Sequence, residues 1–281
     1  MDIATPPSDR PQPAISQRAR ANGWSAQRIT DVSVWAENLW SVRVSKPEGF
    51  VFTPGHYAKL GLPVIAASAD QVPDTLPDQG PVWRAYSIVS SPGEDILEFL
   101  VTLVPGGAMS DLLRGAQPGA AVMVESAAMG FFIASQLAQG ETLWMLSTGS
   151  GVGPYVSMLR EGSVLQRYRK VVVVHSVRTA AELAYADEFR ALAERHEDVV
   201  RYVPVVTREA GRTSLSARIP QLVDSGELED YVGLRLDVAT ARTMVCGNPE
   251  FAAQMRRLLT ARSFQPCRRG LIGSMLFENY W

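Results

Sequence analysis

The residues best suited to chemistry first gather at positions 84–92, which read RAYSIVSSP. In a β-strand the side chains alternate, so Arg84 and Tyr86 share one face while Ala85 and Ser87 share the other. A planar ligand with a pyrophosphate tail could use Tyr86 for stacking, Arg84 as a phosphate fork and the Ser87 hydroxyl for a ring nitrogen. The alternative is an ordinary barrel strand with a surface arginine and a core tyrosine.

A glycine-rich turn follows at positions 104–113, with the sequence VPGGAMSDLL. Its glycines, with Ser110 as the N-cap, are typical of the start of a short helix, where free backbone N–H groups attract an anion. A capped turn without a ligand is the alternative. Together, the two segments supply a platform for a ring and a cradle for phosphate.

A second phosphate site is indicated at positions 143–154, LWMLSTGSGVGP, which read as a buried strand, a turn and a helix. Gly149, Gly151 and Gly153 would let a dinucleotide approach the backbone, and the helix N-terminus favours its pyrophosphate. The spacing differs from the G-x-G-x-x-G fingerprint. A tight β–α turn without a ligand therefore stays open.

The next strand indicates which dinucleotide would bind. It ends in Arg178, a cation at the point where a carboxylate would contact the ribose of NAD. Arg208 and Arg218 come after the third strand, and three cations near successive strand ends suit a 2′-phosphate, which favours NADP(H). A solvated surface role is the alternative for each arginine. Thr179 and Glu182 fit the capping-box pattern, so we expect Glu182 to start a helix.

Cys246 and the chain end are the remaining candidates. Cys246 opens the segment CGNP, and a small thiol followed by glycine at a strand end would leave space for a nicotinamide ring. The alternative is a buried packing role, and we do not expect a nucleophile. The sequence ends in FENYW, and Tyr280 and Trp281 would be unusual in water. We expect them to cover a ligand or to dock in an apolar groove.

Short β-type runs separated by proline and glycine must position the first two segments. These runs are Arg28–Val34, Leu39–Val44, Tyr57–Leu62, Arg84–Val89, Ile96–Val104 and Ala121–Val124. Strands at this density with little helix predict a closed antiparallel β-barrel. Residues 66–81, rich in proline and aspartate, indicate a long surface loop.

After Gly140 the pattern changes to apolar runs without alternation, typical of strands buried on both faces. The strands are expected at Leu143–Leu146, Val171–Val174, Val199–Val206 and Thr243–Cys246, and the helices at Pro154–Gln166, Glu182–Glu194, Ser216–Gly226 and Pro249–Arg262. This order predicts a doubly wound parallel α/β sheet. We expect a disordered N-terminal tail at residues 1–22, a β-barrel domain at 23–136 and an α/β domain at 137–281.

Composition excludes several classes of protein. A net charge of −2 argues against nucleic-acid binding, and two cysteines with three scattered histidines predict no metal site. No signal peptide or membrane-spanning stretch is recognisable, so we expect a cytoplasmic protein, with a monomer as the default. The last segment is basic, with Arg256, Arg257, Arg262, Arg268 and Arg269 against Glu278.

In chain order, these motifs resemble those of the bacterial ferredoxin/flavodoxin–NADP+ reductases. The resemblance runs from about Trp24 to Trp281 and includes R-x-Y-S, the glycine turn with serine, T-G-x-G-x-G-P, C-G-N-P and the terminal E-x-Y-W. It implies non-covalent FAD in the barrel and NADP(H) on the second domain. The catalytic residues would be Ser87, Cys246, Glu278 and Tyr280.

The resemblance also implies the residues that bind the cofactors. Ser87 would lie near flavin N5, Tyr280 over the flavin ring and Trp281 near the adenine. On the flavin side the residues would be Arg84, Ala85, Tyr86, Ser87, Ala108, Met109, Ser110, Thr148, Tyr280 and Trp281. On the nucleotide side they would be Gly149, Gly151, Gly153, Val177, Arg178, Thr207, Arg208 and Arg218, with Arg208 and Arg218 at the 2′-phosphate.

The implied activity is electron transfer between NADP(H) and ferredoxin or flavodoxin through FAD. A small acidic carrier would be attracted by the basic surface, for which Arg256, Arg257, Arg268 and Arg269 are candidates. One alternative is the reductase component of an oxygenase system, although such modules usually carry a cysteine-rich iron–sulfur domain. The other is a flavin-binding regulatory subunit without hydride transfer, which should lack the arginines or the C-G-N turn.

Overall fold

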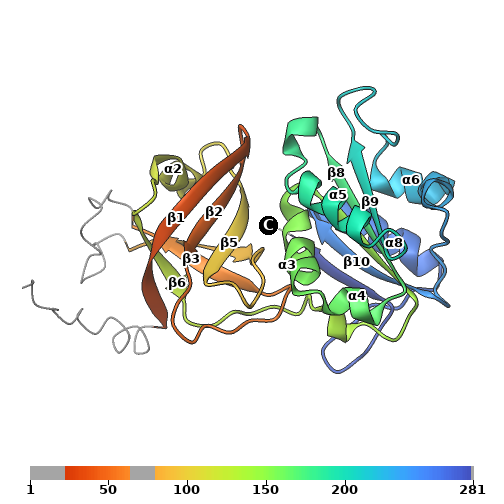
Figure 1. The fold of residues 1–281 in the computed structure, drawn as a ribbon, viewed down its shortest axis with the longest axis horizontal. Helices are drawn as coiled ribbons and strands as arrows, with labels where there is room; N and C mark the ends of the chain where they lie inside the picture. Colours follow the sequence, from red (N-terminus) through yellow and green to blue (C-terminus); the bar gives the residue numbers. More distant parts are fainter. Residues whose placement is uncertain (1–22, 64–79, 280–281) are drawn as a thin grey trace, which may run out of the picture.

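The protein folds into two lobes, a β-barrel and an α/β sheet, which lie side by side (Figure 1). The structure is a computed structural model and describes residues 23–63 and 80–279. The tail predicted at 1–22, most of the loop predicted at 66–81, and Tyr280 and Trp281 lie outside the described residues.

Antiparallel strands form the first lobe. They are β1 (Trp24–Ala36), β2 (Leu39–Ser45), β3 (Tyr57–Leu62), β4 (Val82–Ser87), β5 (Ile96–Thr102) and β6 (Ala121–Glu125). Their order is β4-β3-β6-β1-β2-β5, and an isolated bridge joins Ile88, just after β4, to Phe99 of β5 at the other end of the sheet. Side chains such as Val42, Val44 and Leu60 alternate into the interior. The predicted barrel is therefore confirmed as a nearly closed one.

The helix α2 (Ala108–Gly115) follows the first glycine-rich turn and packs Met109 and Leu113 into the barrel core. The prediction that Ser110 is its N-cap is wrong, because Gly107 occupies that position. Ser110 lies inside the first helical turn, and its hydroxyl accepts a hydrogen bond from the Val104 backbone N–H (2.8 Å). The serine thus fastens the turn to the helix, whose first amides have no partners within the helix.

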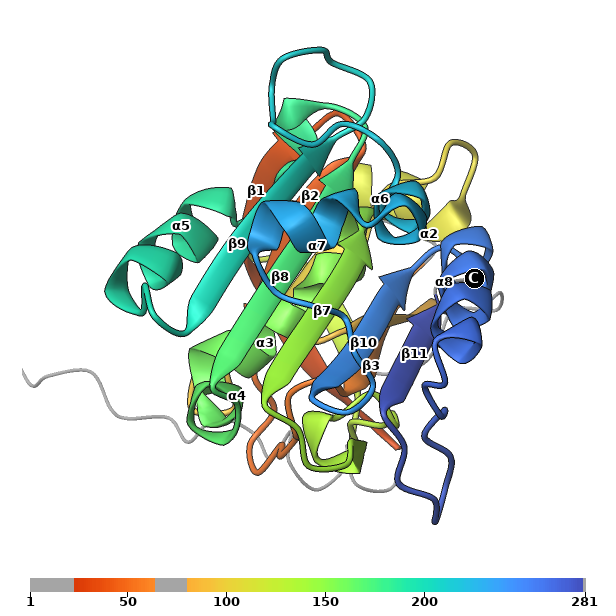
Figure 2. The ribbon, with the colours of Figure 1, turned by 90° about the vertical axis from the view of Figure 1, so that its right-hand side faces the viewer.

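The second lobe contains the predicted parallel sheet with helices on both faces (Figure 2). Its strands are β7 (Thr142–Thr148), β8 (Lys170–Val177), β9 (Val200–Val206), β10 (Ala241–Gly247) and β11 (Met275–Asn279), in the order β11-β10-β7-β8-β9. Its helices are α3 (Gly153–Glu161), α4 (Ser163–Arg167), α5 (Ala186–Arg195), α6 (Ile219–Ser225), α7 (Glu227–Val232) and α8 (Pro249–Ala261). α3, α4 and α5 cover one face, and α6, α7 and α8 cover the other.

Several predicted boundaries in this lobe are wrong for local reasons. The edge strand β11 was not predicted. The helix predicted over Pro154–Gln166 is divided at Gly162, whose φ of 89° ends α3. The predicted capping box forms only in part: the Glu182 carboxyl takes a backbone hydrogen bond from Thr179, but the Thr179 side chain makes no capping bond. Thr179 starts only the 3₁₀ turn Ala180–Glu182. The helix α5 therefore begins later, at Ala186.

The helix α3 lies between the two lobes (Figure 1). Tyr155 and Leu159 of α3 share one apolar cluster with Val89 and Leu100 of the barrel and Met145 of the sheet. Burial of both sides of one helix removes apolar surface from water at both contacts. The barrel and the sheet are thus joined by a continuous core.

We expect the contact around Gly55 to tolerate no side chain. A methyl group there would overlap the Phe132 carbonyl and lie 2.7 Å from Met158 Cε, in a backbone conformation (φ 98°) that L-residues rarely adopt. Gly55→Ala should therefore destabilise the protein by about 3 kcal/mol, the sum of overpacking and backbone strain. Gly49→Ala is the matched control, because its φ is 70° but its site is open, and it should cost about 1 kcal/mol. Equal shifts in the midpoints of urea unfolding would contradict this packing constraint.

Candidate functional site

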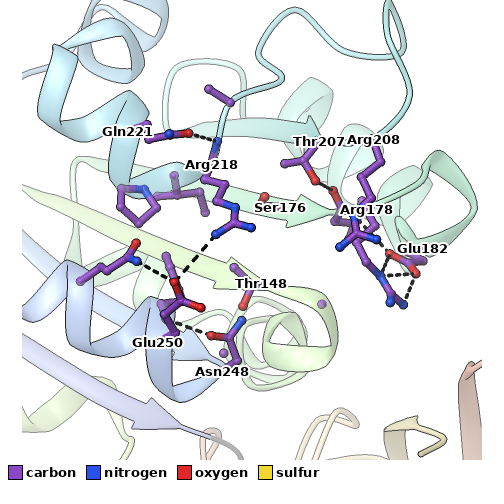
Figure 3. Close-up of a pocket in the computed structure, with 18 of the residues that line it drawn as sticks. Thr148, Ser176, Arg178, Glu182, Thr207, Arg208, Arg218, Gln221, Asn248 and Glu250 are labelled. Atoms are coloured by element: carbon purple, nitrogen blue, oxygen red, sulfur yellow. Dashed lines mark hydrogen bonds and ion pairs between the residues drawn. The ribbon is translucent and has the colours of Figure 1, made fainter. Parts of the chain in front are cut away.

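A pocket of about 620 Å³ lies at the carboxyl ends of β7, β8, β9 and β10 (Figure 3). Ligands of parallel α/β sheets bind at this edge, where successive strands end in loops. The predicted binding residues that line the pocket are Thr148, Gly149, Val177, Arg178, Thr207, Arg208 and Arg218. Residues on separate segments of the chain thus meet in one cavity.

The second glycine-rich turn forms one wall. Gly149 has a φ of 54°, and the chain makes a 3₁₀ turn (Gly149–Val152) before α3 begins. A methyl group at Gly151 would overlap the Cys246 carbonyl, and one at Gly153 would lie 3.1 Å from Val89 Cγ2. The glycines therefore allow β10 and the barrel to approach the turn closely, besides leaving the Gly149 backbone open to a ligand.

His175 of the neighbouring strand β8 supports this turn, a role that the sequence pattern did not indicate. Its buried ring lies with Nε2 3.1 Å from the Gly149 carbonyl oxygen. Burial lowers the pKa of His175 to about 4, so the imidazole is neutral at physiological pH and can donate one N–H to this carbonyl. Only the position of His175 in a buried strand could have suggested this.

The three predicted cations differ in their surroundings. Arg178 is held by Glu182, whose carboxylate accepts from its Nη2 (2.5 Å) and from its backbone N–H (2.9 Å). Arg218 lies 3.9 Å from Glu250. Within the described residues, no carboxylate lies at ion-pair distance from Arg208, whose side chain is drawn beside Arg178 in Figure 3. Arg208 is therefore the best placed of the three to accept an additional anion.

The pocket also contains polar residues that were not predicted. These are Thr102, Ser150, Ser176, Glu182, Ser216, Gln221, Asn248, Glu250 and Gln254. Asn248 caps α8 by accepting a hydrogen bond from the Phe251 backbone N–H (2.9 Å). The Asn-Pro pair before an apolar run is a helix-start signal and could have indicated this position.

A second cluster brings three predicted catalytic residues together. Cys246 and Glu278 are paired across β10 and β11, with Cys246 Sγ 3.9 Å from a Glu278 oxygen. Ser87, at the end of β4, donates a 3.0 Å hydrogen bond to the same oxygen, Oε2. The register of β11, which the sequence did not reveal, therefore places Glu278 against a barrel residue.

The Glu278 carboxyl is electrostatically unusual. Burial raises its pKa to about 7, and the hydrogen bonds from Ser87 and Cys246 only partly oppose this rise. A carboxyl that titrates near neutral pH can take up or release a proton under working conditions. The cluster therefore has the properties of a proton-exchange site.

The barrel face next to this cluster fits a flavin with a pyrophosphate. Among the described strands, β4 (Val82–Ser87) pairs with β3 alone, so no described strand uses its other backbone edge. Arg84 and Ala85 are exposed, while Tyr86 is half-buried against the barrel core. The first amides of α2, at Ala108–Ser110, would supply N–H donors to phosphate.

Among the described residues, no group of three or more histidine, cysteine, aspartate or glutamate side chains could hold a metal ion. Helices in the described part of the chain are too short or too polar to cross a bilayer.

We expect Glu278 to titrate near neutral pH. Infrared difference spectra recorded from about pH 5 to about pH 9 should show the protonated carboxyl band disappearing, with a midpoint at about 7. Ser87→Ala removes a hydrogen bond that favours the charged form, so it should raise the midpoint. Glu278→Gln should lack the transition.

The pH dependence of stability is the control for this titration. Because the folded pKa lies above the ordinary glutamate value of 4.5, the native state binds the proton more tightly than the unfolded chain does. The contribution of Glu278 to stability should therefore fall as pH rises from about 4.5 to about 7. Glu278→Gln should remove this fall, and a carboxyl midpoint near 4.5 in the parent protein would contradict the assignment.

Comparison with known proteins agrees with both halves of this site. Residues 49–133 match the oxidoreductase FAD-binding domain, and residues 145–257 match the oxidoreductase NAD-binding domain. The chain is 39% identical to the flavodoxin/ferredoxin–NADP reductase of Escherichia coli (strain K12), over 92% of this chain and 99% of that protein. It is 33% identical to the ferredoxin–NADP reductase of Pseudomonas aeruginosa, over 90% and 95% of the two chains.

A solved structure shows the same architecture. The ferredoxin NADP+ reductase of Neisseria gonorrhoeae, determined with bound FAD and NADP, superposes with a TM-score of 0.83 at 31% identity, covering 92% of this chain and 99% of that one. Fold, domain matches and identity over almost the whole length agree. This chain belongs to the flavodoxin/ferredoxin–NADP reductase family.

Proposed function

We propose that this reductase transfers electrons between NADP(H) and ferredoxin or flavodoxin through non-covalent FAD. The observation that carries the proposal is the cluster of Ser87, Cys246 and Glu278, which joins the flavin-binding barrel to the nucleotide domain. A flavin bound there would accept a hydride and release electrons one at a time. The protein binds and orients the two cofactors, and it holds or transfers one proton.

The barrel residues hold the flavin. The free edge of β4 presents Arg84, Ala85 and Tyr86 to it, and Arg84 supplies the charge for its phosphates. The amides of Ala108, Met109 and Ser110 bind the pyrophosphate at the start of α2. Thr148 would reach the flavin from the nucleotide domain.

The pocket at the ends of the parallel strands holds NADP(H). Its pyrophosphate would lie at the turn that begins with Gly149, while Val177 and Thr207 would line the adenosine side. Gly151 and Gly153 belong to the same turn but face Cys246 and Val89 instead of the pocket. Arg208 binds the 2′-phosphate with Arg218, while Arg178 is steadied by Glu182. A regulatory subunit without hydride transfer would not need these cations.

Ser87 and Glu278 hold and transfer the proton. The Ser87 hydroxyl donates to Glu278 Oε2, so a proton can move from one residue to the other without crossing bulk solvent. Below about pH 7 Glu278 holds the proton, and above it the carboxylate is ready to accept one. Cys246 packs beside them and leaves room for the nicotinamide ring.

We also propose the domain boundaries, the cellular location and the oligomeric state. A barrel domain at residues 23–136 and a nucleotide domain at 137–281 would each contain one of the two family matches. The enzyme would work in the cytoplasm as a monomer, without nucleic-acid partners. A mixture of purified protein, NADPH and either carrier should reduce a terminal dye faster than the same mixture without carrier; equal rates would contradict the carrier assignment.

Arg208→Ala tests the 2′-phosphate site. Loss of a charge-assisted contact should cost roughly 1.5–3 kcal/mol and raise the Michaelis constant for NADPH much more than that for NADH. Arg169→Ala is the matched control, because Arg169 is exposed and immediately precedes β8, at its amino end, opposite the pocket. Equal effects on NADPH and NADH would show that the 2′-phosphate lies elsewhere.

The acidic carrier should dock near α8. Arg256 lies over the Phe277 ring, 4.1 Å from its centroid, and Phe277 precedes Glu278 in β11. Arg257 is exposed on the same helix, whereas Arg268 and Arg269 lie in the loop before β11, away from the end that carries Glu278.

Charge reversal distinguishes these two pairs of arginines. Arg256→Glu with Arg257→Glu should slow carrier reduction roughly tenfold at low salt, and the loss should shrink as salt rises. The pair Arg268→Glu with Arg269→Glu is the comparison and should have a smaller effect. NADPH-driven reduction of a small dye should not change, and an unaltered rate of carrier reduction in the first variant would remove α8 as the docking site.

A further inference from the structure

Glu98 is a buried carboxylate that the proposed chemistry does not use. It lies in the middle of β5, and its side chain is only 1% exposed. A buried carboxylate is costly unless it is paired and hydrogen-bonded. Its Oε2 accepts from Arg160 (2.7 Å), and its Oε1 accepts from Arg43 (3.2 Å) and from the Tyr185 hydroxyl (3.1 Å).

The partners of Glu98 come from both lobes. Arg43 belongs to β2 of the barrel, whereas Arg160 belongs to α3 and Tyr185 immediately precedes α5. Arg160 also binds Glu188 of α5 through two hydrogen bonds, of 2.7 and 2.9 Å. One barrel carboxylate therefore holds two separate elements of the nucleotide domain.

A chain of hydrogen bonds extends this contact through Tyr185. The Trp35 indole N–H donates to Ser41 Oγ (2.8 Å), and Ser41 Oγ lies 2.6 Å from the Tyr185 hydroxyl. Because Tyr185 uses its only proton toward Glu98, Ser41 must donate to Tyr185. Every donor then points in one direction, from Trp35 to the carboxylate.

The backbone conformation of Tyr185 is a second sign that this contact is tightly constrained. Its φ is 60°, in the left-handed region that bulky residues rarely occupy. Strained residues persist where the surroundings over-determine them, and they cluster at sites with a function. Here the ring packs 5.0 Å from Trp35 while the hydroxyl is held from two sides.

The same elements also hold the chain just beyond Ser87. The Val89 N–H donates to the Glu98 carbonyl (2.8 Å), and the Ser90 hydroxyl accepts from the Glu98 N–H (3.2 Å). From α3, Ser157 Oγ donates to the Ser90 carbonyl (2.7 Å). The segment after Ser87 is thus held between β5, which carries Glu98, and α3, which carries Arg160.

We propose that Glu98, through Arg160 and Tyr185, is a positioning residue for hydride transfer: it fixes α3 and the second glycine turn against the Ser87 end of β4. This inference rests on the proposed function. Reaction between two bound rings depends steeply on their separation, and an error of 1 Å can cost about a hundredfold in rate. Loss of the Glu98 contacts should therefore slow hydride transfer without weakening either cofactor's binding.

The test uses the flavin-loaded enzyme with two substitutions of different severity. Glu98→Gln removes the charge but keeps the size of the side chain, and Tyr185→Phe removes only the hydroxyl. Asp187→Asn is the matched control, since it breaks an exposed ion pair with Arg190 on α5. Flavin bleaching is followed by anaerobic rapid mixing at saturating NADPH, together with flavin content, the dissociation constant of NADP+ and the long-wavelength charge-transfer absorbance.

The expected result is a rate of bleaching roughly 10–100-fold lower in Glu98→Gln and several-fold lower in Tyr185→Phe. Flavin content and NADP+ affinity should stay within about twofold of the parent, and the charge-transfer absorbance should fall. The control should match the parent. Such a loss without weaker binding is not expected from general destabilisation.

Two results would overturn the inference. One is an unchanged rate in Tyr185→Phe or in folded, flavin-loaded Glu98→Gln. The other is a loss of rate that merely follows loss of flavin or of NADP+ affinity, which would make Glu98 a stabilising residue only. A parent enzyme that NADPH fails to bleach would instead refute the proposed function, so the two failures are distinguishable.

Discussion

The hydrogen bond between Ser87 and Glu278 is the contact on which the architecture of the site depends. Its two residues are 191 positions apart, one at the end of a barrel strand and one in the last strand of the parallel sheet. It can form only if β4 ends at the interface and β11 pairs with β10 in the register that places Glu278 beside Cys246. The order of strands in both sheets is therefore a condition for the chemistry.

Holding this contact requires a stiff interface, and α3 provides it. One side of the helix packs on the sheet and the other on the barrel, so neither lobe can move without disturbing a close-packed core. Polar contacts fix the position of α3 within this packing. Arg160 near the end of α3 and Ser157 one turn earlier both bind barrel residues, so the helix is fixed along its axis as well as across it.

The fold was predictable because the two sequence patterns differ so clearly. Alternation in runs such as Leu39–Val44 required strands with one buried face, and runs such as Val171–Val174 required strands covered on both sides. The edge strand β11 was missed because Met275–Asn279 is short and its apolar residues carry no periodicity of their own. Its register, which only tertiary structure defines, is what brings Glu278 to Ser87.

Site residues could be predicted where the residue type alone indicates the role. They could not be predicted where the role depends on which residues the side chain contacts. The glycines of the second turn and the arginines at the strand ends could be found from spacing, and the arginines and Gly149 line one pocket. In contrast, Glu182 matched a capping pattern but binds Arg178, and Ser110 matched an N-cap but lies inside its helix. Glu98 resembled any polar residue of a strand, since nothing in the sequence shows that Arg160 and Tyr185 would bury it.

The most direct test of the account is whether a hydride passes from NADPH to a flavin held at this interface. Anaerobic mixing of the flavin-loaded protein with NADPH should bleach the flavin absorbance, and deuterium at the transferred position of the nicotinamide should slow that bleaching several-fold. A purified, folded protein that is colourless and does not bind added FAD would contradict the account. So would a bound flavin whose absorbance NADPH leaves unchanged.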